Sequence, residues 1–292
     1  MPTTILIGYD GSPAANAVIH VGASLFPGAR AWITYVWVPP FASHKLRERL
    51  RALTHDVNEL IEMVEHEGEH EAQRLLASGV TLARAAGWDA EPLLQRTWGG
   101  EGLRIPQTAE DVQADVVLVG SRGLGGSQAV LGSVSDMVVH YCSRPTLVIP
   151  HPMLEAEYSA LPDGPIAVGW DGSVGATTAL AQVGGLFPER DLLLICVDER
   201  AEVAPPPDLP AIAGRRMHRL NVDQAHGLHT RRISEALITA ASAQNAALVA
   251  VGSRGRSAVR EILLGSVAMG TLHHCHRPVM VVPTEAERTS QP

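Results

Sequence analysis

Short apolar runs alternate with amphipathic stretches along the whole chain. Runs rich in Val, Ile and Leu predict strands at residues 4–8, 31–38, 90–95, 116–120 and 146–149, and again at 166–169, 192–197, 218–222, 247–251 and 279–282. Because strands that are apolar throughout are buried on both faces, they are expected to be parallel and covered by helices on each side. The pattern predicts an α/β fold with doubly wound parallel sheets.

One amphipathic stretch is much longer than the others. A stripe of apolar residues at helical spacing predicts a long helical segment in the first half of the chain, through Leu46, Leu50, Leu53, Val57, Leu60, Ile61, Val64, Ala72, Leu75 and Leu76. The corresponding place in the second half holds the proline-rich run Glu202–Pro210. Since proline does not continue a helix, the second half is expected to have lost most of this helix or replaced it with a loop.

The chain repeats itself. Four segments of the first half recur in the same order in the second: Ile5–Ser12 as Ile166–Ser173, Leu25–Pro27 as Leu186–Pro188, Gly132–Val134 as Gly265–Val267, and His140–Pro145 as His273–Pro278. The repeat is too long for a solenoid unit, so it predicts two homologous domains in tandem. We expect these domains at residues 1–150 and 165–284, joined by a linker at 151–164 and followed by a polar tail at 285–292.

Composition narrows the class of protein. The chain has 292 residues, 46% of them hydrophobic and 18% charged, with a net charge of −8. An acidic chain lacks the basic surface of a nucleic-acid or membrane binder, so neither partner is expected. Three cysteines form no disulfide framework, no signal peptide precedes the first strand, and no apolar run reaches membrane-span length. We therefore expect a soluble cytoplasmic protein.

A glycine-rich loop follows the fourth strand of each half, at Gly120–Ser133 and Gly252–Ser266. Asp10 and Asp171 follow the first strands. Ligands of doubly wound sheets bind beyond the carboxyl ends of the strands, so each aspartate and its loop share a crevice if those strands are neighbours. The closing Gly-Ser opens a helix whose first N–H groups favour an anion, and its serine is placed to cap that helix or to donate to a phosphate. The alternative is a strand–turn–helix joint without a ligand.

Neither loop matches the Walker A motif or the dinucleotide-binding fingerprint. A Walker A loop requires Gly-x-x-x-x-Gly-Lys-Ser/Thr, but the only lysine is Lys45, which lies in the long helical segment. The dinucleotide fingerprint follows the first strand of a sheet, whereas these loops follow the fourth. A kinase or a dehydrogenase is therefore not indicated.

The second loop resembles the ATP-binding signature of the universal stress proteins. Gly252-x-x-Gly255 is followed by nine residues and then by Gly265-Ser266, and the early Asp-Gly-Ser turn and the closing strand Arg277–Val282 also match. The chain thus resembles a tandem universal stress protein. The resemblance implies a Rossmann-like, adenine nucleotide alpha hydrolase-like fold that holds ATP between the first and fourth strands, and it leaves open whether Mg²⁺ accompanies the nucleotide.

The resemblance, with the loop arginines added, implies two sets of nucleotide-binding residues. The aspartate and the second-strand residue would meet the base or ribose, and the loop and its serine would meet the phosphates. The second set is Gly169, Asp171, Cys196, Val251, Gly252, Arg254, Gly255, Gly265, Ser266 and Val267. The first set is Gly8, Asp10, Val36, Val119, Gly120, Arg122, Gly123, Gly132, Ser133 and Val134.

The two loops differ in length and charge. Only eight residues, 124–131, separate Gly123 from Gly132, and Gly125 and Gly126 are the residues able to absorb the missing one. Arginine suits phosphate oxygens, and the second loop carries more of it. Its charged residues are Arg254, Arg256, Arg260 and Glu261, against Arg122 alone in the first. We predict that the second loop is the better phosphate site, although loss of the long helix would leave its pocket more open.

Two histidine motifs look like metal sites and are discounted. His66–His70 fits His-Glu-x-x-His, but its histidines lie off the apolar stripe of the helix, so a solvated acidic face is expected. Neighbouring side chains in His273–His276 point in different directions at a helix end. Cys142 and Cys275 occupy equivalent places in the repeat, which favours a packing role.

These observations favour a nucleotide-binding regulatory module of the stress response over an enzyme, with slow ATP hydrolysis allowed. Two other functions fit the same residues. One is a protein–protein adaptor with vestigial sites, and the other is an ATP-using enzyme. A dimer of chains and an unidentified protein partner stay open, since exposed edge strands invite pairing.

Overall fold

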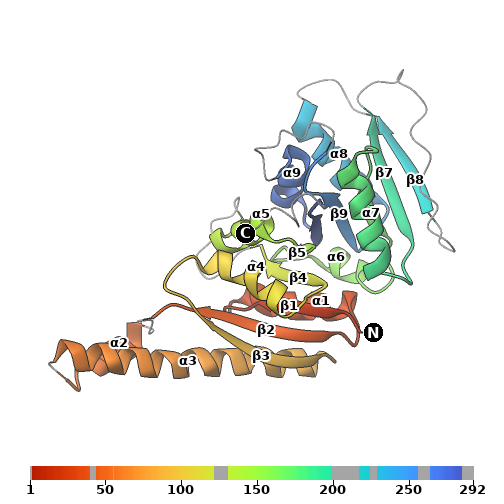
Figure 1. Ribbon diagram of the computed structural model, residues 1–292. Coiled ribbons are helices and arrows are strands. Elements are labelled where there is room, and N and C mark those ends of the chain that lie inside the picture. The colour runs from red at the N-terminus through yellow and green to blue at the C-terminus, as the bar shows by residue number, and fades with distance from the viewer. Residues whose placement is uncertain are drawn as a thin grey trace.

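The computed structural model describes residues 2–39, 44–54, 56–121, 131–198, 217–223, 229–255 and 264–284 (Figure 1). Elements of the first half are β1 (Thr4–Gly8), α1 (Pro13–Leu25), β2 (Arg30–Trp37), α2 (His44–Arg51), α3 (Val57–Ala85), β3 (Asp89–Arg96), α4 (Glu101–Asp111), β4 (Val116–Gly120), α5 (Ser133–Tyr141) and β5 (Thr146–Ile149). After α6 (Glu155–Ala160) come β6 (Ile166–Gly169), α7 (Val174–Leu186), β7 (Leu192–Asp198), β8 (Met217–Asp223), α8 (His229–Ala243), β9 (Leu248–Gly252), α9 (Ser266–His274) and β10 (Val279–Val282).

All these strands form one sheet. Its order is β3-β2-β1-β4-β5-β10-β9-β6-β7-β8, so each half has the order 3-2-1-4-5 and the halves meet at β5 and β10. Within each half the strands are parallel, and β5 pairs with β10 antiparallel, with Val148 opposite Val279 and Leu147 opposite Met280. The predicted α/β fold with parallel sheets is confirmed for each half. The antiparallel junction was not predicted.

Helices cover both faces of this sheet, and each core layer continues across the junction. One layer packs α1, α3 and α7 against the sheet, and the other packs α4, α5, α8 and α9. In the first layer the repeated phenylalanines Phe26 and Phe187 stack with their ring centroids 4.9 Å apart. The repeat therefore buries its own equivalent residues against each other.

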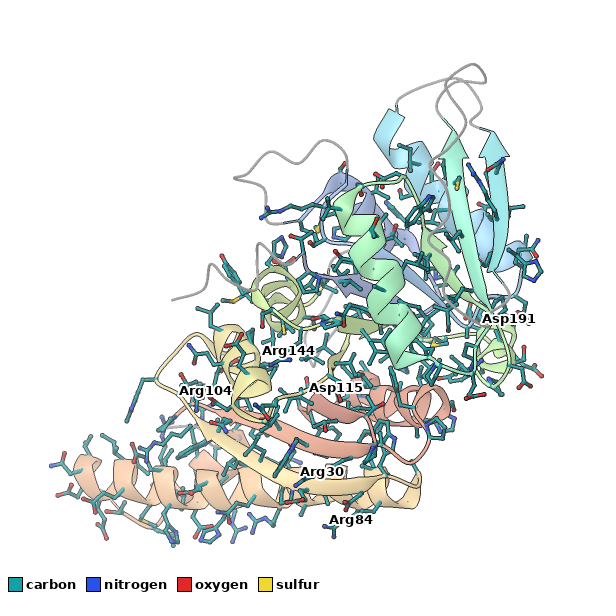
Figure 2. The ribbon with its side chains drawn as sticks, turned by 45° about the vertical axis from the view of Figure 1, so that its right-hand side comes forward. Arg30, Arg84, Arg104, Asp115, Arg144 and Asp191 are labelled. Atoms are coloured by element: carbon teal, nitrogen blue, oxygen red, sulfur yellow. The ribbon has the colours of Figure 1, made fainter. Side chains whose placement is uncertain are left out.

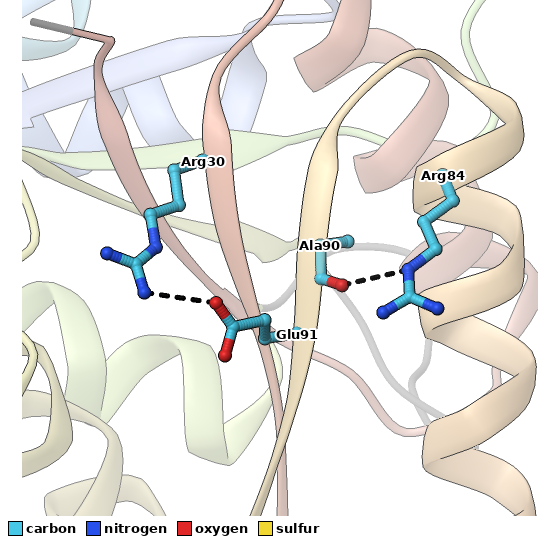
Figure 3. A network of polar contacts seen from close by, with 4 residues as sticks. All are labelled: Arg30, Arg84, Ala90 and Glu91. Atoms are coloured by element: carbon cyan, nitrogen blue, oxygen red, sulfur yellow. Dashed lines mark hydrogen bonds and ion pairs between the residues drawn. The ribbon is translucent and has the colours of Figure 1, made fainter.

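Polar contacts fix the outer edge of the first half and the start of β1. Arg30 of β2 pairs with Glu91 of β3 at 3.0 Å, and Arg84 at the end of α3 donates to the carbonyl oxygen of Ala90 at 3.0 Å (Figure 3). Asp115, labelled in Figure 2, accepts the backbone N–H of Thr4 at 2.8 Å. These bonds set the register of β3 on β2 and the entry of β1 beside β4.

The long helical segment is two helices. The first helix, α2, ends at Arg51 and α3 begins at Val57, where Asp56 caps α3 by accepting the N–H groups of Asn58 and Glu59. The proline-rich run 202–210 and the tail 285–292 lie outside the described residues. The segment expected as the linker contains α6. Among the described helices, none is long and apolar enough to cross a membrane.

Candidate functional site

The two aspartates occupy matching turns after β1 and β6. Asp171 Oδ1 accepts the N–H of Ser173 at 2.9 Å, and Ser173 in turn caps α7. Asp10 Oδ1 accepts the N–H of Ser12 at 2.9 Å in the same way. Gly172 has a φ of +75°, which glycine adopts without strain and which bends the chain away from the strand. Each turn thus holds one carboxylate oxygen in place at the carboxyl end of the sheet.

The second aspartate lies against its glycine-rich loop. A Cβ placed on Gly255 would be 3.2 Å from Oδ2 of Asp171. Because β6 and β9 are neighbours in the sheet, the turn after one strand faces the loop after the other. Asp171 and Gly255 therefore lie side by side at the carboxyl ends of β6 and β9, as the predicted shared crevice requires.

Backbone hydrogen bonds close both loops in the same way. The N–H of Gly265 donates to the carbonyl oxygen of Ser253 at 2.7 Å, and the N–H of Gly132 donates to that of Ser121 at 2.8 Å. A Cβ on Gly265 would be 3.3 Å from the Ser253 oxygen. The start of α9 is therefore held directly beside the first residues of the loop.

The helices after the loops begin without a side-chain cap. Gly132 and Gly265 are the N-caps of α5 and α9, and neither helix start has a side-chain capping bond. Ser133 and Ser266 are the first helical residues, so the expectation that they cap the helix is wrong. First-turn N–H groups have no partner within a helix and favour an anion. Donation from these serines to a phosphate stays a prediction.

The second loop also approaches α7 closely, backbone against backbone. A Cβ on Gly175 would be 2.0 Å from the carbonyl oxygen of Arg254, and one on Gly252 would be 2.6 Å from that of Gly175. Neither glycine can carry a side chain unless the loop moves. The equivalent of Gly175 in the first half is Ala14. Arg254 and Gly255 are thus clamped between α7 and Asp171, and this contact was not foreseen from the sequence.

The valines predicted for the sites lie on one face of the sheet. Val36, Val119 and Val134 join the core layer that contains α4 and α5, and Val251 and Val267 join the same layer in the second half. Cys196 belongs to the opposite layer. Register pairs Thr34 with Gly8 and Ile195 with Gly169, so the equivalent of Val36 is Val197, which lies on the valine face. The offset that relates Asp10 to Asp171 also relates Val36 to Val197.

Gly8 and Gly169 serve close packing at the ends of β1 and β6. A Cβ on Gly8 would be 3.1 Å from Ile105 of α4, and one on Gly169 would be 3.2 Å from Leu237 of α8. The same Cβ atoms would lie 3.4 Å from a valine of the neighbouring strand, Val119 for Gly8 and Val251 for Gly169. These glycines let a helix approach the end of the first strand.

Acidic side chains surround Tyr35 of β2 in the first half. Burial raises the pKa of Tyr35, and the carboxylates of Glu101, Asp10 and Glu71 raise it further. In this half Ser135 also donates to the carbonyl oxygen of Gly120 at 2.6 Å, and its equivalent in the second half is Ala268. The two halves therefore differ in this hydrogen bond to the last residue of the fourth strand, which only the first half makes.

Several predicted residues lie outside the described part of the chain. They are Arg122, Gly123, Gly125 and Gly126 of the first loop and Arg256, Arg260 and Glu261 of the second. The loop comparison by charge and length is therefore a prediction at these positions.

The histidine motif lies on the exposed side of α3. His66 and His70 are both exposed, with ring centroids 4.6 Å apart, as expected for a solvated face. His273 and His274 are exposed at the end of α9. Among the described residues, no group of three or more His, Cys, Asp or Glu side chains is placed to hold a metal ion.

The two equivalent cysteines are buried. Burial raises the pKa of the Cys142 thiol and of the Cys275 thiol to about 11 each. Both cysteines end a helix and precede the strands that join the halves, β5 and β10. Their burial fits the packing role inferred from the repeat.

We expect Cys142 and Cys275 to resist alkylation in the folded protein. At pH 8 a thiol of pKa about 11 is only about 0.1% thiolate, and the thiolate is the reactive form. In a Cys196→Ser background, iodoacetamide should label the native chain at least tenfold more slowly than the urea-unfolded chain. Mass spectrometry counts the labelled sites. Equal rates in the two states would show that these thiols are accessible.

Comparison with known proteins gives a consistent result. The family model described as the universal stress protein family matches residues 1–150 and 164–283. Universal stress protein Rv2005c of Mycobacterium tuberculosis is 29% identical over 73% of this chain and 77% of its own. Universal stress protein Rv1996 of the same organism is 25% identical over 95% of this chain and 94% of its own. The crystal structure of a universal stress protein from Archaeoglobus fulgidus matches 96% of this chain and 98% of its own with a TM-score of 0.67 at 20% identity.

Proposed function

Because the chain belongs to the universal stress protein family, we propose that it binds adenine nucleotide, in the form of ATP, at the loop after β9. The observation that carries this proposal is the position of Asp171 beside Gly255, at the uncapped start of α9. A carboxylate and a helix N-terminus at one crevice offer an acceptor for the adenosine part and donors for the phosphates.

The geometry supports a role for each of these residues. Asp171 Oδ1 is held by Ser173, so Oδ2 is the oxygen that faces the loop and would accept from a ribose hydroxyl or from the adenine amino group. The backbone of Gly252–Gly255 and the first turn of α9 would donate to phosphate oxygens. Val251, Val267 and Val197 supply an apolar wall for the base. Arg254 adds positive charge.

We place the stronger site in the second half. In the first half Ala14 takes the place of Gly175, the glycine that lets α7 approach the second loop, and the loop after β4 carries fewer arginines. We further propose that each half is a separate universal stress protein domain, at residues 1–150 and 165–284. We also propose that the protein is a cytoplasmic regulatory module of the stress response, with no catalytic turnover beyond slow ATP hydrolysis.

Replacing Asp171 by Asn tests the site. Asn has the same shape and keeps an oxygen that can accept the Ser173 N–H. It removes the negative charge, and it replaces the acceptor oxygen that faces Gly255 with an NH2 donor. Loss of a hydrogen bond to a charged group costs about 1.5–3 kcal/mol, so ATP affinity measured by calorimetry should fall at least about tenfold. Bound nucleotide in the purified wild-type protein should be close to one per chain.

The matched control is Asp10→Asn, the same change in the equivalent turn. It should leave ATP affinity unchanged if the second half carries the stronger site. If Asp10→Asn lowered ATP affinity about tenfold and Asp171→Asn did not, the ranking of the two halves would be reversed. Nucleotide-free protein that gives no heat with ATP would support the adaptor instead, and sustained turnover abolished by Asp171→Asn would support an enzyme.

A further inference from the structure

The inner face of α3 runs past the end of the sheet. Toward the middle of the helix this face is buried at Gly68, Ala72 and Leu76, and Leu76 belongs to a core layer of the sheet. The same face continues toward the start of the helix at Ile61 and Val57, where these side chains are 45% and 68% exposed. Residues four apart on a helix are neighbours, so the two form a continuous apolar strip that nothing in the described chain covers.

This strip belongs to a projecting helical hairpin. We use the name hairpin for α2 together with residues 57–71 of α3; its outer part extends beyond the ends of β2 and β3 (Figure 1). The hairpin has a small core of its own, in which Leu50 and Val64 are buried and Leu46, Leu60 and Met63 pack around them. Helices gain most of their stability from packing, so a hairpin with so small a core gains from a partner.

An exposed tryptophan is linked to α3 through Arg96, close to the apolar strip. Trp98, in the turn after β3, is 74% exposed. The Arg96 guanidinium lies 5.0 Å from the centre of the Trp98 ring and 5.1 Å from that of Trp37, and it pairs with Glu65 of α3 at 3.3 Å. Glu65 is one turn from Ile61. The hairpin patch, defined as Val57, Ile61 and Trp98, thus combines two aliphatic residues with an aromatic ring that Arg96 holds in place.

The charges beside the hairpin patch are divided between its two helices. Basic residues dominate α2: Lys45, Arg47, Arg49 and Arg51, against the single acid Glu48. Acidic residues dominate the first half of α3: Glu59, Glu62, Glu65, Glu67, Glu69 and Glu71. A surface with an apolar centre, one basic helix and one acidic helix is complementary to a copy of itself turned about a two-fold axis.

We propose that two copies of this chain dimerise through their hairpins. In the dimer the apolar strips pack together, α2 of one copy lies along the acidic part of α3 of the other, and the reverse contact follows by symmetry. The edges of β5 and β10 already pair within the chain, so they are not available for this purpose. Only one face of each helix enters the contact, so the interface is smaller than the roughly 20–30 residues a side of a standard one, and the dimer is expected to dissociate at low concentration. The dimer does not depend on nucleotide binding.

The test is the sedimentation of the full chain at micromolar concentration. The wild type should sediment as a dimer. Val57→Glu combined with Ile61→Glu places like charges at the centre of the interface and should raise the dimer dissociation constant at least tenfold. The matched control is Leu82→Glu, a residue on the same helix that is 42% exposed beside the sheet and away from the hairpin, and it should leave the dimer intact.

A second variant tests the charges. Arg47→Glu combined with Arg49→Glu removes the complementarity, and it should weaken the dimer without touching the apolar strip. Circular dichroism and unfolding in urea establish that each variant is folded. A monomeric wild type would overturn the proposal, and so would a dimer unaffected by the Val57 and Ile61 changes or equally weakened by Leu82→Glu. Capture of a different protein by a monomeric wild type would assign the patch to that protein and overturn self-association.

Discussion

Replacing Gly175 by Ala should weaken ATP binding by about a hundredfold. The new Cβ would lie 2.0 Å from the carbonyl oxygen of Arg254, closer than real Cβ contacts, so the loop after β9 must shift by roughly 1 Å. In catalysis a misplacement of about 1 Å can cost about a hundredfold, and we expect a loss of that order in ATP affinity when the phosphate donors shift by the same distance. Calorimetry with ATP gives the affinity directly.

Adenosine distinguishes this effect from general damage. The shift acts on the backbone that we assign to the phosphates, so adenosine, which has none, should lose much less affinity than ATP. The control is Gly185→Ala, a substitution in the same helix at a position where a Cβ would meet nothing within 4 Å. Alanine favours helix there by about 1 kcal/mol, and ATP affinity should not change. An unchanged ATP affinity in Gly175→Ala would remove the loop from the phosphate site.

The strands were predictable because their sequence carries the signal locally. Runs such as Val116–Gly120 and Val279–Val282 are apolar throughout, and the structure has strands at those residues. The antiparallel junction was not predictable in the same way. The runs of β5 and β10 are both apolar and each is the last strand of its repeat, but neither run encodes which edge it will meet or in which direction.

Two other features had a local signal that the periodicity concealed. The apolar stripe through Leu53 and Val57 predicts one continuous helix, yet Asp56 followed three residues later by Glu59 is a helix-start pattern, and α3 begins there. Cys196 was assigned as the second-strand site residue, although the constant offset between the halves places Val197 opposite Val36. Cys196 and Val36 lie on opposite faces of the sheet because side chains alternate along a strand.

The contact between α7 and the second loop could not be predicted from any local sequence pattern. Gly175 and Arg254 are far apart in the sequence, and the reason for the glycine is the position of a carbonyl oxygen on another element. The sequence shows that the second half has glycine where the first has alanine. Only the packing of α7 against β9 shows that this difference controls how closely a loop approaches Asp171.

Replacing Phe187 by Ala should lower the free energy of unfolding of the whole chain by about 3–5 kcal/mol. Phe187 is 3% exposed, stacks on the equally buried Phe26, and belongs to a core layer that runs through both halves. Because that layer is continuous, loss of the ring should move a single unfolding transition in urea, followed by far-ultraviolet circular dichroism and by tryptophan fluorescence.

A double-mutant cycle with Phe26→Ala isolates the contact between the halves. The coupling of an aromatic pair is about 0.5–1.5 kcal/mol, so the double variant should be less destabilised than the sum of the two single variants. Val174→Ala, at a position 75% exposed at the start of α7, is the control and should change stability little. Two separate transitions, with Phe187→Ala moving only one, would show that the halves unfold independently. A single transition would mean that fusion has made one cooperative unit, since each half then completes the core of the other.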